Sequence, residues 1–244
     1  MYPELFKIGS LTIYSYGLFV AIGFLAATYI AGRRAKAAGI LPEKIMDINI
    51  YTFLAGIIGA RILYVLTESK YYMKSPGEIL KIWEGGLVFY GALIGGVLFY
   101  FWYVKRQKLD ALLVGDIIIP AVALGQAIGR LGCFMRGCCY GRESNIFGIV
   151  FKDIREPRIP TQLIESAAVL AVFFFLTYRK PKFKGEIFAL YLVMYGTVRF
   201  LIEFLRGDER GPVFFNLLSV SQFISLFAVL AGVIFYRRFK AKNT

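Results

Sequence analysis

The sequence predicts an all-α integral membrane protein of about seven transmembrane helices, with its N-terminus outside and its C-terminus inside. The first observation is composition. Of the 244 residues, 58% are hydrophobic and 17% are aromatic, and the mean hydropathy is +0.61. Ordinary soluble domains of this length are less apolar. A soluble helical core would also need amphipathic surface helices, and no such pattern lies between the apolar runs.

The second observation is a series of seven apolar segments, because a helix needs roughly 20 mostly apolar residues to cross a membrane. Three segments carry no charge: 11–32, 85–104 and 211–236. Four others hold charged residues: 48–67 with Arg61, 111–130 with Asp116, 162–178 with Glu165, and 186–205 with Glu186, Arg199 and Glu203. The first segment is too long for a signal peptide and lacks a small-residue cleavage site, so we expect it to be retained as a span.

The third observation is the distribution of lysine and arginine, which sets orientation. Fifteen of these 29 residues fall in the short segments 32–48, 105–110 and 179–185 and in the C-terminal tail. This bias places those segments inside. The net charge of +13 therefore lies mainly beside the membrane, where it meets anionic headgroups. Aromatic and basic residues do not interleave as in nucleic-acid-binding proteins, so we expect no nucleic-acid partner.

The whole chain, 1–244, is expected to form a single domain, because no linker or low-complexity tract divides it. The sequence also lacks a convincing internal repeat, which argues against transporter folds built from two related halves. The longest segment between spans is 131–161, on the predicted outer side. We expect substrate access or a lid there.

Polar residues within the sixth apolar segment point to a charged ligand. Tyr195, Arg199, Glu203 and Arg206 are spaced by four, four and three residues, which predicts one polar face of a helix. A charge at mid-bilayer costs roughly 2.5–3.5 kcal/mol, so such residues need a partner, a cavity or a function. The alternative is that Arg199 and Glu203 only neutralise each other, which would still leave Arg206.

A second arginine site is the run GQAIGRLGCFMRGCCYGR at 125–142. It combines Arg130, Arg136 and Arg142 with five glycines. Glycine permits close backbone approach, and a guanidinium forks onto phosphate oxygens, so we predict a phosphate cradle. The alternative is close helix packing. Two pairs of glycines spaced by four residues, 125/129 and 91/95, fit the small-residue motif of helix contacts. We prefer packing for the pair at 91/95 but not for the loop predicted after Gly129.

The three cysteines, Cys133, Cys138 and Cys139, all lie in this run. The chain contains no histidine, so a zinc site would lack a convincing fourth ligand, and we predict no metal or other cofactor. Packing as small residues is the favoured interpretation of Cys138 and Cys139. A strained disulfide and a nucleophilic thiol remain open.

These residues resemble the bacterial prolipoprotein diacylglyceryl transferase family over nearly the whole chain. The likeness rests on five segments in the family's order: YSYGLFVAIGF (14–24), IWEGGLVFYGALIGG (82–96), GRLGCFMRGCCYGR (129–142), RIPTQLIES (158–166) and MYGTVRFLIEFLRGDERG (194–211). The resemblance implies a multi-pass enzyme of the bacterial inner membrane. It would move diacylglycerol from phosphatidylglycerol to the lipobox cysteine thiol of a prolipoprotein signal-peptide segment, releasing glycerol phosphate.

The resemblance also implies site residues. The family's functional positions match Tyr16, Arg130, Gly141, Tyr195, Arg199, Glu203 and Arg206. We expect Arg130 and Arg199 to clamp the donor phosphodiester, with Arg136 also binding substrate and Glu203 holding an arginine in place. Tyr16 and Tyr90 complete the predicted catalytic set.

Three positions depart from better-known members of the family: Tyr90 replaces a histidine, Cys133 an asparagine and Cys138 a glutamate. The proton acceptor is therefore open among Tyr90, Glu203 and Glu165, or a positive field favours thiolate. Tyr90 is alternatively an interfacial anchor. Other functions left open are a transferase of the same fold with another acceptor, an anion transporter or channel, and a non-catalytic phospholipid-binding protein.

Overall fold

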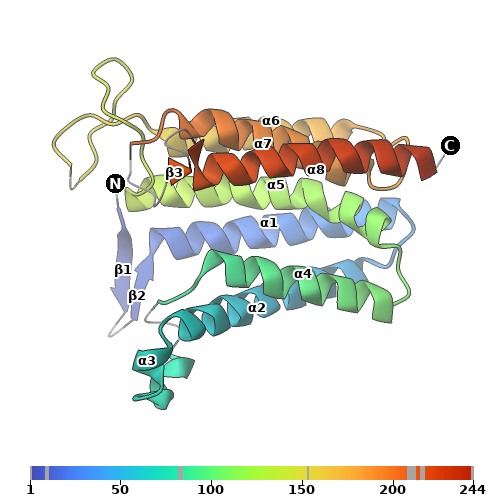
Figure 1. The fold of residues 1–244 in the computed structure, drawn as a ribbon, viewed down its shortest axis with the longest axis horizontal. Helices are drawn as coiled ribbons and strands as arrows, with labels where there is room; N and C mark the ends of the chain where they lie inside the picture. The colour runs from blue at the N-terminus through green and yellow to red at the C-terminus, as the bar shows by residue number, and fades with distance from the viewer. Residues whose placement is uncertain are drawn as a thin grey trace. The chain divides into compact units, whose positions relative to one another are not determined.

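The structure, a computed structural model, describes residues 2–8, 11–81, 85–152, 154–207, 213–214 and 218–242. The long helices are α1 (Ser15–Ala37), α2 (Pro42–Thr67), α4 (Phe89–Arg106), α5 (Ala111–Arg136), α6 (Thr161–Tyr178), α7 (Glu186–Glu203) and α8 (Val220–Lys242) (Figure 1). The short elements are helix α3 (Ser69–Tyr72), the 3-10 helix η1 (Pro76–Leu80) and two antiparallel hairpins, β1 (Glu4–Ile8) with β2 (Leu11–Tyr14) and β3 (Val213–Phe214) with β4 (Leu218–Ser219).

The long helices confirm a helical membrane protein. Within the described residues, five of them are long and apolar enough to cross a membrane: α1, α2, α5, α6 and α8. Helices α4 and α7, of 18 residues each, occupy the two other predicted segments but are not among those five. The helical content is therefore as predicted, and the number of crossings remains an expectation.

The predicted limits of the first and last spans are wrong. Residues 11–14 form β2, which pairs with β1, so the first helix begins only at Ser15. Thr12, Ile13 and Tyr14 favour extended structure, which explains why an apolar run begins as a strand. The last helix begins at Val220, after β4, rather than at 211, and residues 211–212 and 215–217 lie outside the described residues.

The chain divides into two compact units, and the first comprises Met1–Ala31 and Gly115–Thr244. Its core joins α5, α6 and α7 through buried side chains that include Ala123, Val169 and Phe173. Gly23 and Gly125 bring α1 against α5, because a Cβ on Gly23 would lie only 2.8 Å from the Gly125 carbonyl oxygen. The packing alternative for the pair at 125/129 therefore holds for Gly125.

Two of the charges predicted within apolar segments stabilise the start of α7. The Asp116 carboxylate accepts hydrogen bonds from the backbone N–H groups of Gly185 (2.7 Å) and Phe188 (2.9 Å). A carboxylate at a helix N-terminus satisfies unpaired donors and complements the helix dipole. Glu186 pairs with Arg179 on the loop after α6. Both acidic residues therefore have structural partners.

The second unit comprises Gly32–Val114 and contains the helix pair α2 and α4, which lie side by side in Figure 1. Glycines line their contact: a Cβ on Gly59 would overlap the Gly91 carbonyl oxygen, and one on Gly95 would lie 3.2 Å from the Gly59 Cα. Close packing by Gly91 and Gly95 is thus confirmed.

Candidate functional site

A cluster of charged residues joins three helices of the first unit. Arg130 near the end of α5 and Glu165 in the first turns of α6 form an ion pair of 2.8 Å between Nη2 and Oε1. Arg199 of α7 approaches the other carboxylate oxygen, with Nη1 4.0 Å from Glu165 Oε2. The Glu165 side chain is only 1% exposed. A buried carboxylate therefore lies between two guanidinium groups.

Arg199 has further partners on its own helix and on α8. Its Nη2 lies 2.6 Å from Glu203 Oε2 and donates to the Ser221 hydroxyl at 3.1 Å. Ser219 donates to the other Glu203 oxygen at 2.9 Å. The neutralising pair of Arg199 and Glu203 therefore forms, as the alternative interpretation had it. However, the buried Arg199 Nη1 has no hydrogen-bond partner among the described residues. The pair with Glu203 therefore leaves a guanidinium donor of Arg199 unused.

Two tyrosines of α7 border the charged cluster. The Tyr191 hydroxyl lies 2.8 Å from Gln126 Oε1 on α5, and the rings of Tyr191 and Tyr195 are stacked with centroids 5.6 Å apart. Tyr195 is close enough to interact electrostatically with Glu165, Arg130 and Arg199. It therefore lies at the edge of the cluster, as its position on the helix predicted.

Arg206 is not on the same helical face, so that part of the spacing argument is wrong. Helix α7 ends at Glu203, and Arg206 instead forms an isolated antiparallel bridge with Gly141. The adjacent Arg142 N–H donates to the Leu205 carbonyl at 2.9 Å. A Cβ on Gly141 would overlap the Leu205 carbonyl oxygen and lie 2.9 Å from Ile159 Cβ. The absence of a side chain at Gly141 lets the two segments approach.

The glycine-rich run is mostly helical, so the predicted cradle is not a loop after Gly129. Helix α5 continues to Arg136, because backbone pairing and packing override the helix-breaking tendency of its glycines. Gly132 packs against α1, where its Cβ would lie 2.9 Å from Phe19 Cβ, and Gly137 turns the chain with φ +77°. A Cβ on Gly129, one residue before Arg130, would meet no atom within 4 Å.

The three cysteines meet at the end of α5. Their Sγ atoms all lie within 4.8 Å of one another, and those of Cys138 and Cys139 are 3.5 Å apart. All three are free thiols, so the disulfide alternative is not present. Hydrogen-bond contacts with the Cys133 and Cys138 thiols, and then the neighbouring Arg206 guanidinium, hold the pKa of the Cys139 thiol below its usual range.

The remaining predicted residues lie in different places. Tyr16, in the first turn of α1, is 40% exposed and is an electrostatic neighbour of Arg130 and all three cysteines. Arg136, the last residue of α5, is exposed. Tyr90 belongs to the second unit, where it is 47% exposed and its ring packs edge-on against Phe89. Tyr16 therefore lies near Arg130, as predicted for a common site. Tyr90 is described only by its neighbours within the second unit.

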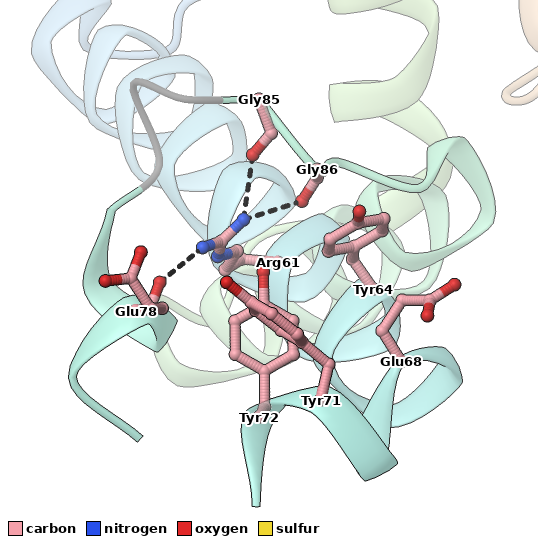
Figure 2. A pocket seen from close by; sticks show the side chains of 8 residues that line it. All are labelled: Arg61, Tyr64, Glu68, Tyr71, Tyr72, Glu78, Gly85 and Gly86. Carbon is pink, nitrogen blue, oxygen red and sulfur yellow. Dashed lines mark hydrogen bonds between the residues drawn. The ribbon is translucent and has the colours of Figure 1, made fainter. Parts of the chain in front are cut away.

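The second unit holds another buried arginine, in a cavity of about 350 Å³ (Figure 2). Arg61 donates hydrogen bonds to the carbonyl oxygens of Ile79, Gly85, Gly86 and Glu78, at 2.7–3.2 Å. Its guanidinium also lies over the rings of Tyr64 and Tyr72. Because backbone carbonyls occupy these donors, Arg61 anchors the segment around η1 to α2.

Sequence reasoning missed the central place of Glu165, which it named only as a charge within an apolar segment and as a possible proton acceptor. A lone acidic residue in an apolar segment was the available signal, but its two arginine partners come from other helices. It also missed Ser219 and Ser221, whose hydroxyls fix Glu203 and Arg199. Two serines within a long apolar run carry no distinctive pattern.

Comparisons with known proteins all point to one protein family. A sequence model of the family described as prolipoprotein diacylglyceryl transferase matches residues 3–238. Relatives named phosphatidylglycerol–prolipoprotein diacylglyceryl transferase include one from Clostridium tetani, 41% identical over 96% of each chain, and one from Finegoldia magna, 36% identical over 96% of this chain and 94% of the relative. A third, numbered 2 in Clostridium perfringens, is 38% identical over 97% of this chain and 95% of its own.

Proposed function

Because this chain belongs to the prolipoprotein diacylglyceryl transferase family, we propose that it transfers the diacylglyceryl group of phosphatidylglycerol to the lipobox cysteine of prolipoproteins. The bond formed is a thioether between the cysteine sulfur and the glyceryl carbon. The bond broken joins that carbon to the phosphate oxygen, and glycerol phosphate leaves with the electron pair.

The observation that supports this function most directly is the placement of Arg130 and Arg199 around Glu165. Two guanidinium groups within apolar helices are costly unless they bind anions, and Arg199 Nη1, 4.0 Å from Glu165, has no hydrogen-bond partner among the described residues. A phosphodiester is an anion of matching geometry, since guanidinium groups bind phosphate oxygens through paired hydrogen bonds. These arginines would stabilise the negative charge that grows on the leaving phosphate.

The other predicted residues would support this arrangement. Glu203, held by Ser219, would position Arg199, and Tyr195 would border the headgroup. Gly141 would act by allowing the close approach that holds Arg206 beside the site. Arg136, exposed at the end of α5, would attract the anionic donor, while Tyr16 and Tyr90 would hydrogen-bond the substrates.

We further propose that the chain crosses the bacterial inner membrane seven times, with its N-terminus outside and C-terminus inside. Both units would then belong to one transferase domain, 1–244, with α4 and α7 as the two additional crossings. The lysine and arginine bias supports this orientation. Alkaline phosphatase fused after Lys242 should be inactive, and an active fusion would contradict the orientation.

The decisive test is transfer by the purified protein in phosphatidylglycerol vesicles to a synthetic lipobox peptide. Mass spectrometry should find the peptide heavier by one diacylglyceryl group, and glycerol phosphate should appear in equal amount. The same peptide with serine in place of its cysteine should remain unmodified. Lipidation only of a different acceptor would instead support a transferase with another substrate, and no product from phosphatidylglycerol would refute the proposal.

A further inference from the structure

The convergence of three thiols beside the arginine cluster suggests a second kind of chemistry. In the described part of the chain, Cys133, Cys138 and Cys139 are the group whose Sγ atoms all lie within 4.8 Å of one another. Zinc binds thiolate sulfur at about 2.3 Å in tetrahedral geometry, which separates ligand sulfurs by about 3.8 Å. Small rotations of the three cysteine side chains would therefore bring their sulfur atoms to the distances that one zinc ion requires.

The backbone holds these cysteines in place without a metal. After the turn at Gly137, the Cys138 N–H donates to the Cys133 carbonyl at 3.2 Å. Two side chains of α6 fix the following carbonyls: Gln162 donates to that of Cys138 at 2.6 Å, and Thr161 to that of Cys139 at 2.9 Å. Cys139 adopts φ +68°, which is rare for a residue with a side chain. This conformation directs both cysteines back toward Cys133.

The surroundings suit a zinc ion held by three thiolates, which has a net charge of −1. Arg206 lies against Cys139, and Arg130 interacts electrostatically with Cys133 and Cys139. These cations would offset the negative charge of the site. Cys138 and Cys139 are only half-buried, so a fourth ligand has access to an ion at this position. Three protein ligands with one open position are typical of catalytic zinc sites.

We propose that the three cysteines bind Zn²⁺ and that the acceptor thiol occupies its fourth position. This inference rests on the proposed function. The chain has no histidine to take the thiol proton, and coordination to a metal deprotonates a thiol outright. The released proton passes to water. The bound thiolate then attacks the glyceryl carbon, and the carbon–oxygen bond breaks as glycerol phosphate leaves with its electron pair.

The first test measures metal binding without requiring activity. The protein is purified under reducing conditions and its zinc content is determined by mass spectrometry, with about one ion per chain expected. Replacement of zinc by Co²⁺ should give sulfur-to-cobalt charge-transfer absorption. Cys133→Ser, Cys138→Ser and Cys139→Ser should each abolish zinc retention. Ser144→Ala, on the same outer segment, is the matched control and should keep it.

A thiol added to the cobalt form tests the open position. A lipobox peptide should increase the charge-transfer absorption, because a fourth thiolate joins the ion, and the peptide with serine should not. The proposal is overturned if the reduced protein binds neither metal, if the serine variants retain the ion, or if thiol labelling in membranes shows these cysteines joined as a disulfide.

The transfer assay separates this inference from the function on which it rests. Transfer by a wild-type protein that holds no metal would refute the zinc site and leave the function standing. Zinc retention without transfer to any lipobox peptide would refute the function, and with it the role assigned to the fourth position.

Discussion

The guanidinium of Arg130 and the carboxylate of Glu165 lie 2.8 Å apart, although the two residues belong to different helices. The carboxylate is buried, and its second oxygen faces Arg199. Removing one partner of a buried ion pair leaves an uncompensated charge. Glu165 therefore helps to fix where both arginines lie, although its 4.0 Å contact with Arg199 Nη1 is too long to satisfy that donor with a hydrogen bond.

We expect Glu165→Gln to reduce both stability and transfer. The amide keeps the size of the side chain but removes the charge shared by two arginines, which should lower the free energy of unfolding by about 3–5 kcal/mol. Thermal unfolding in detergent and the transfer rate measure the two effects. Glu165→Asp, which keeps the charge on a shorter side chain, should recover part of both. An unfolding temperature equal to that of the wild type would show that the carboxylate has no such role.

Arg130→Ala and Arg199→Ala should each reduce transfer by about 10²–10³-fold, because each removes a donor that stabilises the developing phosphate charge. The reconstituted transfer assay measures this, and the membrane fraction shows whether the variant is inserted. Arg155→Ala, at an exposed arginine between α5 and α6, is the matched control and should transfer at the wild-type rate. Full activity of either clamp variant would exclude it from the phosphate site.

The sequence predicted the long helices because each coincides with a long apolar run, and five of the described helices are long and apolar enough to cross a membrane. It also identified the charges that need explanation, Arg130, Glu165 and Arg199 among them. It did not predict their pairing, because periodicity relates residues only along one helix. The Arg199–Glu203 pair was visible for that reason, and the Arg130–Glu165 pair was not.

Helix ends were predicted less well because tertiary contacts determine them. The spacing of Arg206 continued the polar face of α7, yet the helix ends at Glu203 and the chain then pairs with Gly141. Similarly, we predicted a loop after Gly129, but α5 continues to Arg136, and a close contact with α1 holds Gly132 within the helix. Glycine is common both in turns and at close helix contacts. The sequence does not show which neighbouring helix packs against a glycine, so it could not distinguish the two.

The two glycines Gly141 and Gly129 should respond oppositely to alanine. Gly141→Ala places a Cβ on the Leu205 carbonyl oxygen, so we expect destabilisation of about 1–3 kcal/mol and reduced transfer as Arg206 is displaced. Gly129→Ala adds a Cβ in open space within a helix and should stabilise the fold by up to about 1 kcal/mol. Thermal unfolding of both variants checks this. Equal unfolding temperatures for the two would contradict the packing assigned to Gly141.

Tyr90→Phe should slow transfer by about 2- to 10-fold, the effect of losing one hydrogen bond between neutral groups. The reason is our proposal that this hydroxyl hydrogen-bonds a substrate at a position where the resemblance places a histidine. The substitution preserves the aromatic ring that packs against Phe89. The change therefore isolates the hydroxyl from the ring. Rates are measured at saturating phosphatidylglycerol with varied lipobox peptide, so that an effect on the acceptor appears in kcat/KM. Tyr71→Phe, another half-exposed tyrosine of the second unit, is the control. Because an interfacial anchor needs only the ring and its position, an unchanged kcat/KM for Tyr90→Phe would assign Tyr90 to that structural role.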